Sequence, residues 1–110
     1  MKRDIGLYVE DIKDSINNIL LFIKGIDKAK FLLDKLRQSA VARELEIIGE
    51  AAKNVPDSLR EKYPSIPWND IAGFRDVLSH AYFRVDLEMV WKIVEQDLPF
   101  LKKEIEKITV

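Results

Sequence analysis

The segment RDVLSHAYF, residues 75–83, gathers side chains that could together move protons and bind a phosphate. Its histidine, His80, is the only histidine in the chain. On an ideal helix Asp76 lies one turn before His80, and Arg75 lies one turn before Ser79. A carboxylate at Asp76 would orient the imidazole and favour its protonated form. The segment therefore predicts a proton-transfer group beside a guanidinium that can bind phosphate through two hydrogen bonds.

Cleavage of RNA is a reaction that such a pair can perform without a metal ion. RNA supplies its own nucleophile in the 2′-hydroxyl, so cleavage needs proton transfer and stabilisation of the negative charge on the reacting phosphate. His80 is the predicted proton-transfer group, and Arg75 is predicted to neutralise the phosphate. Asp76 and Ser79 are predicted to support them.

The spacing of the pair also predicts a dimer. Arg75 and His80 are five residues apart, which separates them by about 140° around an ideal helix, so one copy presents a loose site. Two copies that meet at a twofold axis would each supply both groups and enclose a cleft between them. Arg75 and Tyr82, seven residues apart, nearly eclipse if the helix continues.

Each of these residues also has a plain structural interpretation. A single histidine near the end of a helix is commonly a packed or capping residue. Arg75 and Asp76 could belong to a solvated helix face, and Tyr82 could pack with Phe83 at a helix end.

Apolar periodicity predicts the helices that must position the segment. Residues 4–24 form one long helix, and Gly25 interrupts the pattern. Asp27 is a predicted N-cap for a shorter helix that continues through Leu36. The predicted stripe of the first helix consists of Ile5, Tyr8, Ile12, Ile16, Ile19 and Ile23.

Residues 39–55 predict a third helix, in which Val41, Leu45, Ile48 and Ala52 share one face. Gly49 in its interior predicts a close helix crossing, because glycine otherwise lowers helix stability.

The next segment is a predicted connection that is interrupted by Pro56, Pro64 and Pro67. It is predicted to contain one short helix over residues 57–63, with Asp57 or Ser58 as the N-cap. The remaining predicted helices start at Trp68 and at Asp86, and Pro99 either kinks the last helix or restarts it after Asp97. We expect an all-α antiparallel bundle of four main helices plus a short connecting helix, in one domain over residues 1–110.

Composition limits the possible classes of function. The 110 residues include no cysteine, which excludes disulfides and thiolate metal sites, and we expect neither a metal nor a cofactor. The charged start and the short apolar runs predict no signal peptide and no membrane span, so we expect a cytoplasmic protein. A net charge of −1 gives no support for general nucleic-acid binding, so RNA would have to bind at a local positively charged patch.

Two further groups of residues have competing interpretations. Glu46 and Glu50 lie one helical turn apart and could hold a divalent metal, but no histidine accompanies them, so a solvated face or a dimer contact is favoured. Trp68 and Trp91 are predicted core or interface aromatics, with base stacking as the alternative for Trp68.

The sequence resembles a known family. Arg75, His80 and Tyr82 match the R-x(4–6)-H-x-Y signature of HEPN-domain proteins, and the surroundings are similar to HepT-type toxins. Three blocks carry the resemblance in the same order as in that family: LEIIGEAAKNVP, YPSIPWNDIAGFRDVLSHAYF and VDLEMVWKIVEQDLP. With the first helix included, the resemblance covers nearly the whole chain.

The resemblance implies a dimeric, metal-independent endoribonuclease toxin in which Arg75 and His80 are catalytic and face their copies across a cleft. It also implies a minimal nucleotidyltransferase as the antitoxin partner, which inhibits the toxin by transferring AMP from ATP to Tyr82. A bulky anionic group there would compete with substrate phosphate for Arg75. The family commonly has Asn where this chain has Asp76, whose charge would repel RNA phosphate.

Two alternatives to the nuclease remain open. The bundle could be a non-catalytic binding module that regulates, or is modified by, the nucleotidyltransferase. It could also be a structural helical dimer in which the motif has decayed.

Overall fold

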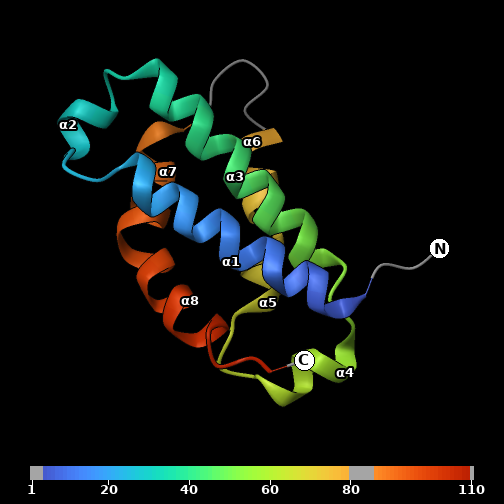
Figure 1. Ribbon diagram of the computed structural model, residues 1–110. Coiled ribbons are helices and arrows are strands. Elements are labelled where there is room, and N and C mark those ends of the chain that lie inside the picture. The colour runs from blue at the N-terminus through green and yellow to red at the C-terminus, as the bar shows by residue number, and fades with distance from the viewer. Residues whose placement is uncertain (1–3, 80–85, 110) are drawn as a thin grey trace.

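The computed structural model describes residues 4–79 and 86–109, and every regular element in these ranges is a helix (Figure 1). The predicted all-α class is confirmed. The elements in chain order are α1 (Ile5–Phe22), α2 (Lys28–Phe31), α3 (Lys35–Lys53), α4 (Asp57–Lys62), α5 (Trp68–Ala72), α6 (Phe74–Ser79), α7 (Leu87–Lys92), the π-helical turn η1 (Ile93–Asp97) and α8 (Leu98–Ile105).

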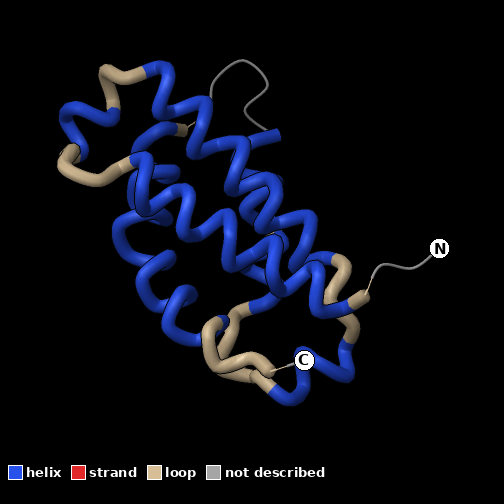
Figure 2. The backbone as a smooth tube through the Cα atoms, viewed as in Figure 1, coloured by secondary structure: helices blue, strands red, loops and turns tan. Residues whose placement is uncertain are grey.

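The longer elements form an antiparallel bundle whose chain direction alternates. Helix α3 packs along α1 in the opposite direction, and α5 followed by α6 returns along α3 (Figures 1 and 2). The α7–η1–α8 segment then runs back, with α8 against α1. Helix α4 is the predicted short connection. Within the described ranges, no helix combines the length and apolar character that a membrane crossing requires.

A continuous apolar core holds the bundle together. Ile12, Ile16 and Ile19 of the predicted α1 stripe are fully buried, and all four residues of the predicted α3 face are buried as well. Both tryptophans belong to this core: Trp91 lies with its ring centroid 5.2 Å from that of Phe31, and the Trp68 indole N–H donates to the carbonyl oxygen of Tyr63 at 3.1 Å. Burial therefore assigns Trp68 to packing rather than to base stacking.

Several predicted helix boundaries were wrong, for identifiable local reasons. The helix after Asp27 ends at Phe31 instead of continuing through Leu36, because Asp34 caps a new helix by accepting a hydrogen bond from Arg37 N–H at 3.0 Å. Asp27 itself is the predicted cap, accepting from Lys30 N–H at 2.9 Å.

The structure also differs from the prediction at the start of α4 and in the continuity of the helix after Pro67. Helix α4 starts directly at Asp57 after Pro56, without a side-chain cap. A turn at Gly73 divides the predicted continuous helix after Pro67 into α5 and α6.

The last helix restarts at Leu98, as one of the two predicted outcomes for Pro99. Proline lacks the N–H that would bond four residues back, and its ring would collide with that carbonyl in a regular helix. The wider turn of η1 immediately before Pro99 accommodates both defects. Leu98, Leu101 and Ile105 still face the core.

Candidate functional site

Helix α6 carries the part of the predicted site that the structure describes. Arg75, Asp76 and Ser79 lie within α6. His80 and Tyr82 lie outside the described residues, so the predicted pairing of an arginine with an imidazole and a phenol stays a prediction.

Gly49 sets the position of the Arg75 backbone. A Cβ atom at residue 49 would lie 3.1 Å from the Arg75 backbone nitrogen, and 3.3 Å from both the Ala72 carbonyl oxygen and the Arg75 Cβ. The absence of a side chain therefore lets α3 approach the junction of α5 and α6 at van der Waals distance. The predicted close crossing at Gly49 is confirmed, and the helix that it contacts is the one that carries Arg75.

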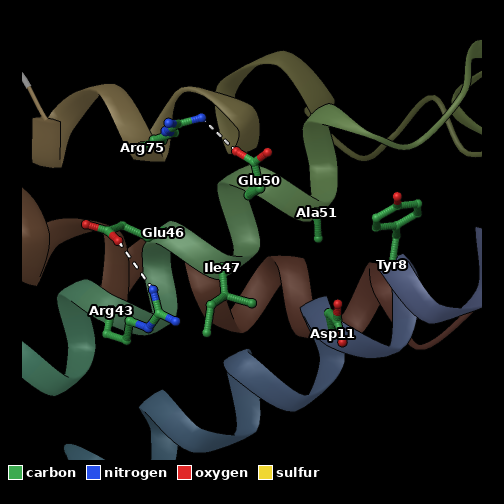
Figure 3. Close-up of a pocket in the computed structure, with 8 residues that line it drawn as sticks. All are labelled: Tyr8, Asp11, Arg43, Glu46, Ile47, Glu50, Ala51 and Arg75. Atoms are coloured by element: carbon green, nitrogen blue, oxygen red, sulfur yellow. Dashed lines mark hydrogen bonds and ion pairs between the residues drawn. The ribbon is translucent and has the colours of Figure 1, made fainter. Parts of the chain in front are cut away.

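The next residue of α3 contacts the other end of the same arginine. Arg75 Nη1 donates a hydrogen bond to Glu50 Oε2 at 2.7 Å, which also makes an ion pair (Figure 3). The two side chains are 53% and 54% exposed, so water and ligands reach both. Such an exposed pair contributes only about 0–1 kcal/mol to the stability of the fold.

A pocket of about 320 Å³ adjoins this pair, lined by Tyr8, Asp11, Arg43, Glu46, Ile47, Glu50, Ala51 and Arg75. Figure 3 shows Tyr8 and Asp11 extending from α1 and the middle five residues from α3. Its charged lining comprises three carboxylates, Asp11, Glu46 and Glu50, and two guanidinium groups, Arg43 and Arg75. A phosphate bound at Arg75 would therefore be attracted by the guanidinium and repelled by the nearby carboxylates.

Glu46 and Glu50 each pair with an arginine. Arg43 Nη1 lies 3.8 Å from Glu46 Oε2 one turn along the same helix, while Glu50 reaches across to α6. Within the described ranges, no group of three or more His, Asp or Glu side chains is arranged to hold a metal ion. The favoured interpretation of these glutamates as a solvated face agrees with their half-exposed side chains.

Sequence patterns did not indicate that Glu50 contacts Arg75. The two residues are separated by 25 positions, and helical spacing relates Glu50 only to Glu46. A signal was present, however: Gly49 predicted a crossing, and a charged residue beside a crossing glycine is placed to reach the opposing helix.

Comparison with known proteins agrees with the resemblance described above. The family model described as "Ribonuclease HepT-like" matches residues 12–108. The chain is 48% identical over 108 residues to a probable ribonuclease HepT of Thermococcus cleftensis, an alignment that covers 98% of each chain. It is 44% identical over 105 residues to a candidate RNase of Methanocaldococcus jannaschii, covering 96% of each chain.

A second candidate RNase of Methanocaldococcus jannaschii is 46% identical over 107 residues, which are 97% of this chain and 92% of the relative. No solved structure is significantly similar to the chain. The family match spans the bundle, including α3 and α6, whose crossing holds Arg75. The chain therefore belongs to the HepT-like family of ribonucleases.

Proposed function

We propose that this protein is a cytoplasmic, metal-independent endoribonuclease that acts as the toxin of a toxin–antitoxin pair. Membership of a ribonuclease family supports the reaction class. The observation that carries the assignment of residues is the placement of Arg75, whose backbone is packed against α3 while its guanidinium is about half exposed beside a pocket. An arginine held in this way can meet a phosphate from solvent without rearrangement of the fold.

The proposed reaction uses the RNA 2′-hydroxyl as the nucleophile. The 2′-oxygen forms a bond to phosphorus, the bond from phosphorus to the 5′-oxygen breaks, and a cyclic phosphate remains on the upstream fragment. His80 takes part in the proton transfers, which remove the proton of the 2′-hydroxyl and supply one to the 5′-oxygen. Arg75 neutralises the charge that accumulates on the phosphate oxygens. Asp76 orients His80, and Ser79 is a supporting residue whose hydroxyl lies one helical turn after Arg75 on an ideal helix.

The proposal includes a homodimer with the site at its interface. Arg75 and His80 point about 140° apart on an ideal helix, so two copies around a twofold axis bring complementary groups together better than one copy does. Cross-linking or light scattering of the purified protein measures the oligomeric state, and a monomer that cleaves RNA at full rate contradicts this part.

The decisive experiment is cleavage of RNA by the purified protein in excess EDTA. The variants Arg75→Ala and His80→Ala are expected to lose cleavage while retaining the helical circular dichroism signal of the unmodified protein. Lys103→Ala, which removes a cation from an exposed position of α8, serves as the control and is expected to cleave normally. Equal cleavage by all four proteins excludes the proposed roles.

We further propose that a minimal nucleotidyltransferase is the antitoxin partner and that it transfers AMP from ATP to Tyr82. The added phosphate would compete with RNA for Arg75, which explains inhibition by charge and bulk. Incubation with the partner and ATP, followed by mass spectrometry, should place the AMP mass on the peptide that contains Tyr82. Tyr82→Phe should remain toxic in the presence of the partner.

A second candidate function is a non-catalytic module whose role is to bind or be modified by that partner. The carboxylate-rich pocket and the pairing of Arg75 with Glu50 favour it, because both disfavour an RNA phosphate. Modification of Tyr82 without any RNA cleavage by the unmodified protein would support this candidate over the nuclease.

A further inference from the structure

We propose that Glu50 is a positioning residue, which holds the guanidinium of Arg75 in the orientation that receives the reacting phosphate. The inference rests on the proposed nuclease function, in which Arg75 is the phosphate-neutralising group. It adds a residue from a different helix to the site.

Two consecutive residues of α3 fix the two ends of one side chain. Gly49 brings α3 close to the Arg75 backbone nitrogen and Cβ, and Glu50 accepts the hydrogen bond from Nη1 at 2.7 Å. An arginine side chain whose backbone is packed and whose tip makes a hydrogen bond samples fewer rotamers before substrate arrives. The contact therefore orders Arg75 in advance of the reaction.

The geometry argues against a purely stabilising role for the pair. Both side chains are about half exposed, and exposed pairs contribute little to folding. Exposed pairs such as Lys102–Glu106 and Arg43–Glu46 connect neighbouring turns of one helix, and the exposed pair Lys28–Glu88 joins α2 to α7 at a longer distance of 3.6 Å. The Arg75–Glu50 pair, at 2.7 Å, joins two helices at the point where their backbones touch, so its geometry is set by the crossing.

Glu50 also carries a charge that opposes the substrate. A carboxylate beside Arg75 repels RNA phosphate, whereas its oxygen atom orients the guanidinium. The substitution Glu50→Gln separates these effects, because the amide oxygen can still accept the hydrogen bond but the negative charge is absent. Glu50→Ala removes both.

The kinetic test measures kcat and KM for RNA cleavage by the unmodified protein and three variants. Glu50→Ala is expected to lower kcat about tenfold with KM within about twofold, because the arginine acts on charge that develops in the transition state. Glu50→Gln should recover at least half of the unmodified kcat. The matched control is Glu106→Ala, which removes an exposed glutamate of similar accessibility from the ion pair with Lys102 on α8 and should leave both constants unchanged.

A kcat for Glu50→Ala equal to or above that of the unmodified protein overturns the proposal, since Glu50 would then only compete with phosphate. A Glu50→Gln variant as slow as Glu50→Ala overturns it as well. Since Glu50 is 54% exposed, these variants should fold, and thermal unfolding of each checks this directly.

A measurement without substrate distinguishes failure of this inference from failure of the nuclease proposal. In protein labelled with ¹⁵N-arginine, the Arg75 side-chain signals, assigned by their loss in Arg75→Lys, report rotation of the guanidinium. Rotation should be slow in the unmodified protein and in Glu106→Ala, and faster in Glu50→Ala. Equal rotation in all three refutes positioning even when RNA is cleaved. Restricted rotation without cleavage leaves the contact intact and refutes the nuclease proposal instead.

Discussion

Substitution of Gly49 by alanine tests whether the crossing of α3 with α5 and α6 limits the site. By helix propensity alone, alanine should stabilise α3 by about 1 kcal/mol. In this structure the new methyl group would lie 3.1 Å from the Arg75 nitrogen and 3.3 Å from the Ala72 carbonyl oxygen. These are backbone atoms of a packed helix junction, so they cannot rotate away as the tip of a side chain could.

The net effect follows from the two opposing contributions. Overpacking by one methyl group in a tight contact costs about 1–3 kcal/mol, so the propensity gain is outweighed and we expect Gly49→Ala to lower the free energy of unfolding by about 1 kcal/mol. For a domain of this size that corresponds to a fall of about 4 °C in Tm. Gly49→Val should lose more, because it adds two methyl groups to the Cβ atom that is already in tight contact.

The same displacement should reduce catalysis. If α6 moves away from α3 by a few tenths of an ångström, the Arg75 side chain moves with it, and kcat is expected to fall about threefold to fivefold. The activity assay measures kcat for RNA cleavage. The free energy of unfolding is measured by urea unfolding followed by tryptophan fluorescence, because Trp68 and Trp91 are both buried. All variants are compared at one protein concentration. A Gly49→Ala protein that is about 1 kcal/mol more stable and equally active refutes the reasoning.

Two further predictions concern the scaffold. The backbone N–H of Arg37 and then its guanidinium hold the pKa of Asp34 below its ordinary value of 3.8, so the stabilising contribution of this charge is present above that value and is lost as pH falls below it. Asp34→Asn keeps an oxygen acceptor for the helix cap but does not titrate. The difference between the urea midpoints at about pH 7 and about pH 3 should therefore be smaller for Asp34→Asn than for the unmodified protein. An equal difference in the two proteins contradicts the prediction. Arg60 donates to the carbonyl oxygens of Ala52 at 2.7 Å and Val55 at 3.0 Å, so Arg60→Ala should cost about 2 kcal/mol of unfolding free energy, and Arg60→Lys, which lacks the fork of donors, should recover only part of it.

Regular periodicity predicted the helices well, whereas local capping determined where they end. The buried stripes of α1 and α3 followed directly from apolar residues at steps of three and four. The segment KFLLDKL has apolar residues on both sides of Asp34, so periodicity alone gave one helix where the structure has two. An aspartate inside an apolar pattern can be a surface residue or a cap, and the backbone conformation that decides between them is not encoded in spacing.

The candidate site was predictable to a similar extent. The sequence identified Arg75 and the crossing at Gly49 separately, but it did not connect them, because contact between α3 and α6 depends on how the helices pack. Glu50 was considered with its neighbour on the same helix, where periodicity operates. Its actual partner is a residue of another helix, and such pairs become visible only in three dimensions.

The contact between α3 and α6 has a consequence for how such a protein can evolve. The atoms that meet Gly49 are the backbone and Cβ of residue 75 and the carbonyl of residue 72, none of which requires an arginine at position 75. Mutation of that arginine should therefore leave the architecture nearly intact. Under the proposed mechanism, in which Arg75 neutralises the phosphate, a single substitution would abolish cleavage and leave a folded scaffold on which a non-catalytic role could evolve.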